Sequence, residues 1–140
     1  MLNTRISVVI PTYNSAAYLP AAIDSAFNQT LPPFEIVVID DGSIDNTVEV
    51  LKPYEVRIRY IFQENKGPAA ARNRGIAEAN GDLIAFLDSD DVWLPEKLEL
   101  QVPVLTENPK IGLVHSDFFL LDMKTGTELP SRRNGGGVCR

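Results

Sequence analysis

Short apolar segments alternate with segments of helical periodicity in the first part of this chain, and this alternation constrains the fold more than any other feature. Four segments are rich in β-branched and aromatic residues and are bounded by turn-forming residues, so they are predicted strands: residues 6–10, 35–39, 56–62 and 83–87. Three of them are almost continuously apolar, which is typical of strands covered on both faces. In the third, apolar and basic side chains alternate, which favours a strand covered on one face only or a strand at an edge.

A predicted helix separates each strand from the next. Residues 19–27 carry an apolar stripe at helical spacing, with Asn14 or Ser15 available as the N-cap. A short helix is predicted around residues 48–51, and an alanine-rich helix over residues 69–80. Connections of this kind are right-handed and place successive strands in parallel, so we predict an α/β fold with three layers, α/β/α, around a mostly parallel sheet.

The pattern is less regular after the fourth predicted strand. Residues 93–105 have helical character that a proline interrupts, and residues 111–116 and 118–121 are predicted strands. The last ten residues, 131–140, contain three consecutive glycines and no apolar periodicity, so a mobile tail is expected there. We expect the rest of the chain, residues 1–130, to form one domain.

Composition and charge exclude several classes of protein. A chain of 140 residues is long enough for one hydrophobic core, and a formal net charge of −6 argues against a nucleic-acid partner. The single cysteine excludes an intramolecular disulfide framework. The first apolar run stops at Pro11 and is too short for a signal-peptide core or a membrane span. A cytoplasmic location is therefore expected, at the cytoplasmic face of a membrane if the chain is part of a longer one.

Six of the ten aspartates lie just after two of the predicted strands, at Asp40, Asp41 and Asp45 and at Asp88, Asp90 and Asp91. Parallel sheets bind ligands beyond the carboxyl ends of their strands. Capping or turn formation explains a single aspartate such as Asp45, but neighbouring carboxylates repel one another, and this favours a cation between them. Carboxylates without histidine or cysteine select Mg²⁺ or Mn²⁺, so we predict a metal site at Asp88 and Asp90.

The first strand-to-helix turn contains no glycine, which excludes both the dinucleotide fingerprint and the P-loop. A bound diphosphate would need neutralisation by the metal and by a cation such as Arg72, for which a solvated or structural role is the alternative. Tyr13 presents an aromatic face that suits a nucleobase, with core packing as the alternative. Asp41 is suited to accept a hydrogen bond from a base N–H.

Five linked segments then carry a family resemblance. Their order and spacing resemble the motifs of family-2 glycosyltransferases, which are inverting nucleotide-sugar enzymes with the GT-A fold. The five segments are SVVIPTYN, NQT, EIVVIDDGSIDNT, NKGPAAARNRGI and GDLIAFLDSDDVWLPEKL. The resemblance covers residues 6–98. It implies a truncated, Rossmann-like GT-A domain that uses Mn²⁺ or Mg²⁺ to bind a nucleotide-sugar donor, with a UDP-sugar expected. The acceptor, a sugar, a lipid or a protein, is not identified.

The resemblance also implies roles for individual residues. Nucleotide binding falls to Pro11, Thr12, Tyr13, Asp41, Arg72, Asp88 and Ser89, and metal binding to Asp90 and Asp88. The first three are similar to the segment that lines the base pocket in the family. The segment from Asp88 to Asp90 resembles the family's DXD motif, whose first acid lies near the ribose and whose last acid binds the metal.

One part of the family pattern is missing. The general base of these enzymes belongs to a motif well beyond the DXD segment, and no segment here matches it, so the base is not identified; Asp117, Asp122 and Glu128 lack its context. We therefore expect a fragment that lacks the acceptor half and is weak or inactive alone. The apolar surface left without that half predicts a homodimer.

Two other functions remain open from the sequence. A module that binds a nucleotide sugar without transferring it would have the same motifs. A haloacid-dehalogenase-like phosphatase would also have an apolar strand followed by a segment like FLDSDDV, with Asp88 as nucleophile. That motif normally ends the first strand of its domain, whereas here it ends the fourth.

Overall fold

The computed structural model describes residues 4–122 and 124–130, and the predicted tail at 131–140 lies outside them. The described residues form two compact units, which divide after residue 99. Among the described residues, no helix is long and apolar enough to cross a membrane.

The first unit is built on a four-stranded sheet in the order β3-β2-β1-β4, with every neighbouring pair parallel. Its strands are β1 (Ile6–Thr12), β2 (Glu35–Asp40), β3 (Arg59–Phe62) and β4 (Leu83–Phe86). All seven residues of β1 are buried, as the continuous apolar pattern predicts for a central strand. β3 lies at an edge, which is one of the two predicted positions, but it begins later than residue 56 because Arg57 and Ile58 donate their N–H groups to the Tyr54 carbonyl in a turn.

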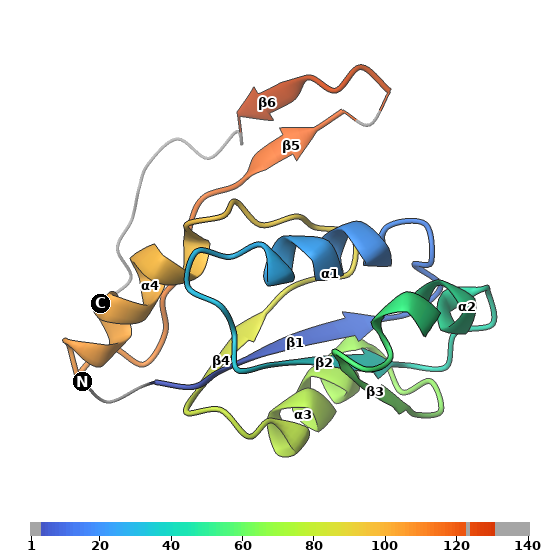
Figure 1. Ribbon diagram of the computed structural model, residues 1–140, viewed down its shortest axis with the longest axis horizontal. Coiled ribbons are helices and arrows are strands. Elements are labelled where there is room, and N and C mark those ends of the chain that lie inside the picture. The colour runs from blue at the N-terminus through green and yellow to red at the C-terminus, as the bar shows by residue number, and fades with distance from the viewer. Residues whose placement is uncertain (1–3, 123, 131–140) are drawn as a thin grey trace. The chain divides into compact units, whose positions relative to one another are not determined.

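Helices cover both faces of this sheet (Figure 1). α1 (Leu19–Phe27) and α2 (Thr47–Leu51), which continues into the 3-10 helix η1 (Lys52–Tyr54), contact each other on one face, and α3 (Pro68–Glu78) packs on β1 and β2 from the other. The predicted three-layer α/β/α architecture is confirmed. The N-cap of α1 is Tyr18 rather than Asn14 or Ser15, because Ser15 forms a turn whose carbonyl accepts the N–H groups of Tyr18 and Leu19.

The face of the sheet under α3 is closely packed. Val9, Val37 and Ile39 form a buried cluster with Ala71 of α3. A Cβ atom at Gly75 would collide with the Val9 side chain. The absence of a side chain at Gly75 therefore allows α3 to approach β1 closely, and this fixes the position of the first turns of α3 beside the carboxyl ends of the strands.

α4 (Lys97–Thr106) begins four residues later than the pattern predicts. The preceding residues are used elsewhere: Gln29 donates its Nε2–H to the Leu94 carbonyl at 2.8 Å, and the Pro95 carbonyl accepts the Thr30 N–H at 2.9 Å. The Gln29 Oε1 in turn accepts the Leu98 N–H at 3.0 Å, in the first turn of α4. The buried Gln29 side chain thus ties the end of α1 to the segment that follows β4.

The described part of the second unit contains a hairpin of β5 (Phe119–Leu121) and β6 (Glu128–Pro130), paired antiparallel. The predicted strand at residues 118–121 is confirmed within one residue, whereas the strand predicted at residues 111–116 is wrong. That segment has no regular structure, and most of its side chains are exposed. An apolar run forms a strand when a neighbour supplies its backbone hydrogen bonds, and none pairs with it among the described residues.

Candidate functional site

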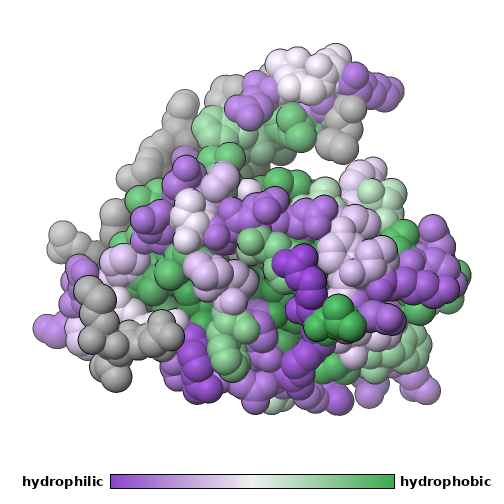
Figure 2. All heavy atoms as spheres, in the orientation of Figure 1, coloured by the Kyte–Doolittle hydropathy of each residue, from purple (hydrophilic) through white to green (hydrophobic). Residues whose placement is uncertain are grey.

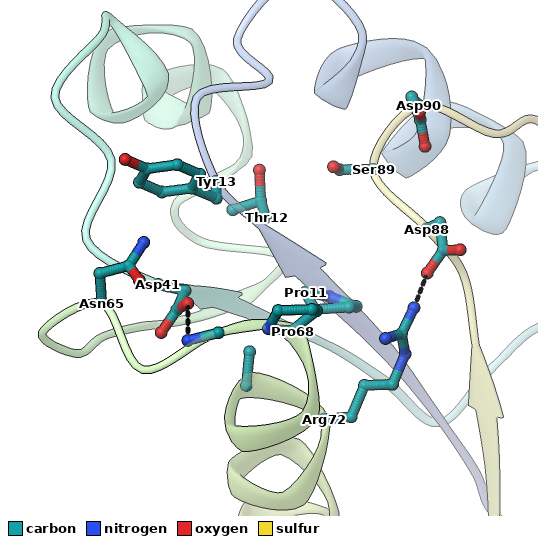
Figure 3. Close-up of a pocket in the computed structure, with 12 residues that line it drawn as sticks. Pro11, Thr12, Tyr13, Asp41, Asn65, Pro68, Arg72, Asp88, Ser89 and Asp90 are labelled. Carbon is teal, nitrogen blue, oxygen red and sulfur yellow. Dashed lines mark hydrogen bonds and ion pairs between the residues drawn. The ribbon is translucent and has the colours of Figure 1, made fainter.

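The strand order places a topological switch point between β1 and β4. From the central β1 the chain builds outward through β2 to β3, then returns through α3 to add β4 on the other side of β1. Parallel sheets of this kind bind ligands where the strand order reverses, outside the carboxyl ends. A pocket of about 380 Å³ opens there (Figure 3), lined by Pro11, Thr12, Tyr13, Asp41, Asn65, Gly67, Pro68, Ala71, Arg72, Asp88, Ser89 and Asp90.

All eight residues that the sequence singles out for nucleotide or metal binding line this pocket. Asn65, Gly67, Pro68 and Ala71 line it as well and were not predicted. They belong to the loop after β3 and to the first turn of α3. The segment NKGPAAARN contains all four, so the motif marked the region, but sequence spacing does not show which of its side chains face the strand ends.

Asn14 fixes the loop that carries Tyr13. Its backbone has a left-handed conformation, with φ of 49°, which asparagine tolerates better than most residues. Its N–H donates to the Ser43 Oγ at 2.9 Å, and its Oδ1 accepts the Ile44 N–H at 2.8 Å. These bonds join the loops after β1 and β2, and Tyr13 remains half-exposed at the pocket, 49% accessible.

Asp41 is buried at the end of β2 and accepts three hydrogen bonds from the chain itself. Its Oδ1 accepts from the Gln63 Nε2–H at 2.7 Å and the Lys66 N–H at 2.9 Å, and its Oδ2 accepts from the Gly67 N–H at 2.8 Å. Burial alone would raise the pKa of Asp41, but these hydrogen bonds outweigh burial and hold the pKa below its ordinary value. The carboxylate therefore fixes the loop between β3 and α3, a role that sequence reasoning missed.

The opposite side of the pocket is acidic. The Leu87 N–H donates to the Val9 carbonyl at 3.0 Å, which extends the pairing of β4 with β1 up to the start of the acidic loop. In that loop Asp91 donates its N–H to the Asp88 carbonyl at 3.0 Å. Burial, followed by the negative charges of Asp90 and Asp88, raises the pKa of Asp91. The charges of Asp88 and Asp90 thus disfavour the ionisation of Asp91, and a cation bound beside them would relieve this repulsion.

Arg72 reaches from α3 to the acidic loop and is the cation that faces it in Figure 3. Its Nη2 lies 2.6 Å from the Asp88 Oδ1. Both side chains are accessible, 38% for Arg72 and 49% for Asp88, so the pair contributes little to the free energy of folding. Arg74, the other arginine of this helix segment, instead pairs with Glu78 four residues along α3. A solvent-accessible pair at the rim of a pocket is available for exchange with an anionic ligand.

The donor set on this side suits a hard divalent cation. It consists of carboxylate oxygens from Asp88 and Asp90, with Ser89 between them, and the pocket has no histidine or cysteine in its lining. Among the described residues, no group of three or more histidine, cysteine, aspartate or glutamate side chains is arranged to hold a metal by itself. The pair thus fits a cation that takes its remaining ligands from water and phosphate oxygens, as Mg²⁺ does.

Comparisons with known proteins agree with this fold and site. Residues 7–128 match the family described as Glycosyl transferase family 2. An uncharacterised glycosyltransferase of Nostoc sp. is 44% identical over 115 residues, which are 79% of this chain and 36% of that protein.

Two solved structures are similar as well. TarS 1–349 of S. aureus in complex with UDP-GlcNAc is 32% identical over 74% of this chain and 31% of that chain, with a TM-score of 0.64. The mannosyltransferase PcManGT of Pyrobaculum calidifontis, in complex with GDP-Man and Mn²⁺, is 28% identical over 78% and 34%, with a TM-score of 0.64. The chain spans about a third of the length of the Nostoc protein and of these two solved chains. Because the family match covers most of its residues, this chain belongs to glycosyl transferase family 2.

Proposed function

We propose that this domain binds the nucleoside diphosphate of a nucleotide-sugar donor and takes part in inverting glycosyl transfer to an acceptor hydroxyl. The observation that carries the proposal is the composition of one pocket: an aromatic and amide side, from Tyr13 and Asn65, faces an acidic side with an arginine. A nucleotide has the same polarity, with a flat base at one end and a charged diphosphate at the other.

The base occupies the side formed by the loops after β1, β2 and β3. The accessible Tyr13 ring offers a stacking face. Asp41 has three internal hydrogen bonds and still has acceptor capacity on its carboxylate, so a direct contact with a base N–H remains part of the proposal. We expect UDP, because the relative solved with UDP-GlcNAc supports that donor class; the relative solved with GDP-Man keeps guanine as the alternative.

The diphosphate occupies the side formed by Arg72 and the acidic loop. Arg72 exchanges Asp88 for a phosphate oxygen, and Asp88 is then free to accept from the ribose or to bind the cation. Asp90 and Asp88 hold the divalent ion, Mn²⁺ or Mg²⁺. When bound, that ion neutralises the negative charge that develops on the departing diphosphate.

In the transfer step the acceptor oxygen bonds to the anomeric carbon while the bond from that carbon to the diphosphate oxygen breaks on the opposite face. The acceptor proton passes to a base that we do not assign. Asp122, one of the acids beyond the acidic loop, accepts the N–H of Lys124 at 2.8 Å and so has a role in a turn. The acceptor and the predicted homodimer stay predictions, as does a cytoplasmic location.

Calorimetric titration of UDP into the purified chain, with Mn²⁺ and again with EDTA, tests the proposal. We expect metal-dependent binding of UDP, and weaker binding of GDP, CDP and TDP. Binding without turnover of any sugar nucleotide and acceptor would favour the module that binds without transfer. Hydrolysis of p-nitrophenyl phosphate with Mg²⁺ would favour the phosphatase. Absence of binding by all four nucleotides would refute the proposal.

A further inference from the structure

Arg72 and Asp88 form an ion pair whose two backbone positions are held by the packing of the first unit. Arg72 follows Ala71, which is 1% exposed and packs in the buried cluster on β1 and β2. Asp88 follows Leu87, which is equally buried and donates its N–H to the Val9 carbonyl at 3.0 Å. The backbone at both residues is therefore fixed, and only the two side chains are able to change partners.

This ion pair engages one of the two carboxylates that are proposed to hold the cation. The Arg72 Nη2 donates to the Asp88 Oδ1 at 2.6 Å, and among the described residues Asp88 is the only side chain that Arg72 hydrogen-bonds. Figure 3 shows the guanidinium extending from α3 to the acidic loop, away from the side of the pocket that carries Tyr13 and Asn65. In the free domain a proposed metal ligand is thus already engaged by a positive charge.

A guanidinium and a divalent ion compete for the same carboxylate, because two positive charges side by side on it repel each other. Binding of a metal ion by Asp88 therefore requires that Arg72 leave it. The exchange is possible, because the side chains of Arg72 and Asp88 are 38% and 49% accessible and a pair so exposed is weak. A guanidinium that leaves Asp88 still lines the pocket, where the proposed function supplies a phosphate oxygen as its other acceptor.

We propose that the ion pair of Arg72 with Asp88 is a latch that couples metal binding to nucleotide binding. While the latch is closed, Arg72 competes with the metal for Asp88, and Asp88 competes with the diphosphate for Arg72. Filling either subsite opens the latch and raises the affinity of the other, and thermodynamic linkage makes this effect reciprocal. The inference rests on the proposed function and adds to it a regulation of metal and donor affinity.

The test removes the guanidinium in Arg72→Gln and titrates Mn²⁺ alone into the full chain, with free Mn²⁺ measured by its electron paramagnetic resonance signal. We expect the variant to bind Mn²⁺ about twofold to fivefold more tightly than the parent, the equivalent of one solvent-accessible ion pair. It should bind UDP at saturating Mn²⁺ about tenfold more weakly, because the diphosphate loses a charge-assisted hydrogen bond. A variant that had merely lost structure would bind both ligands more weakly.

Arg74→Gln is the matched control, because Arg74 lies on the same helix, pairs with Glu78 at 2.8 Å and does not line the pocket. It removes the same charge from the chain, so it measures the general effect of charge on Mn²⁺ affinity. We expect it to bind Mn²⁺ and UDP as the parent does. Urea unfolding of both variants should stay close to that of the parent, because each loses one accessible ion pair.

Two further measurements follow the latch itself. The ratio of UDP affinity with Mn²⁺ to UDP affinity with EDTA should be about twofold to fivefold smaller in Arg72→Gln than in the parent, because the variant has no latch for the metal to open. In the parent, saturating Mg²⁺, which is not paramagnetic, should shift the NMR signal of the Arg72 guanidinium and leave that of Arg74 in place.

Three results would overturn the latch alone. Equal affinity of Arg72→Gln and the parent for Mn²⁺, or for UDP, would show that Arg72 does not exchange between the two subsites. An equal gain of Mn²⁺ affinity in Arg74→Gln would assign the effect to charge in general. An Arg72 signal that Mg²⁺ leaves in place would show that the pair stays closed when metal binds. Failure of the parent to bind UDP with Mn²⁺ would instead refute the proposed function, and the coupling with it.

Discussion

At the scale of single residues, the pocket separates side chains that hold the fold from side chains that are free to meet a ligand. Asp41 is buried and receives three hydrogen bonds, whereas Asp88 is accessible and shares a single ion pair with Arg72. Both aspartates follow apolar strands in the sequence. Their different environments give them different expected responses to substitution.

Asp90→Asn removes one charge from the proposed metal pair and keeps the size of the side chain. We expect it to weaken Mn²⁺-dependent UDP binding by at least about tenfold. Mutation of a residue that only hydrogen-bonds a metal ligand already lowers metal affinity by that factor. Its unfolding midpoint should not fall, because removing a charge from a cluster that raises the pKa of Asp91 relieves repulsion. Glu96→Gln, which neutralises an exposed acid outside the pocket, is the control. If Asp90→Asn binds UDP and Mn²⁺ as the parent does, the metal assignment is wrong.

Asp41→Ala should destabilise the chain by about 1–3 kcal/mol, because the part-buried N–H donors of Lys66 and Gly67 lose their acceptor. The pKa of Asp41 is lowered in the folded state, so its contribution to stability is complete above its unfolded pKa of about 3.9 and is lost as the pH falls through the folded value. Urea unfolding between pH 2 and pH 7 measures this.

The difference in unfolding free energy between the parent and Asp41→Ala should shrink as the solution becomes more acidic. If this difference stays constant between pH 2 and pH 7, the ionised carboxylate of Asp41 does not stabilise the fold as described. Weaker UDP binding by the variant with unchanged metal dependence is expected as well, because the loop that carries Asn65 loses its attachment and the base loses an acceptor.

At the scale of elements, one close contact decides where α3 stands relative to the pocket. Gly75 lies against Val9 of the central strand, and the same helix carries Arg72 toward Asp88 one turn earlier. Displacement of α3 would therefore move Arg72, together with Pro68 and Ala71, which also line the pocket.

Gly75→Ala should lower the free energy of unfolding. Overpacking against Val9 costs about 1–3 kcal/mol, which exceeds the gain of about 1 kcal/mol from the higher helix propensity of alanine. Val9→Ala removes the methyl groups that collide, so the double variant should be less destabilised than the sum of the two single changes. Gly112→Ala is the control, since no atom lies within 4 Å of a Cβ built there. Equal stability of Gly75→Ala and the parent would mean that α3 can shift at no cost.

At the scale of the whole molecule, the two units differ in how much they bury. The strands of the sheet centre are buried, while Phe119, Leu120 and Leu121 of β5 are each more than half exposed. The edge strand β4 also leaves Ile84 and Phe86 partly exposed. On the face seen in Figure 2, hydrophobic residues show between hydrophilic ones. Such surface is the basis of the predicted homodimer.

Hydrogen exchange should resolve this difference along the chain. Amides of β1 and β2 should exchange slowly, through global unfolding, and those of β5 should exchange orders of magnitude faster, because an isolated two-stranded hairpin is marginal in water. Equal protection of both regions would contradict the expectation. Protection of β5 that rises with protein concentration, matched by a faster-sedimenting species, would show that the chain self-associates through this hairpin.

The sequence by itself determined the strands of the sheet, the alternation with helices and the chemistry of the strand ends. Apolar runs 6–10 and 35–39 form buried strands, because the centre of a parallel sheet with helices on both faces covers both faces of a strand, and the residues that follow them then lie on one edge of that sheet. Eight of the residues that line the pocket could be predicted from these strand ends and from the family motifs, whereas Asn65, Gly67, Pro68 and Ala71 could not.

Tertiary structure alone decided which side chains are satisfied and which are not. Asp41 and Thr12 both follow or end an apolar strand, yet distant loops supply three donors to the first and no partner to the second. The segment 111–116 is apolar enough for a strand but forms none without a neighbouring strand. Hydrogen bonds and strand pairs depend on residues that are distant in the sequence and close in the folded chain. A local sequence pattern identifies a residue but does not identify its partner.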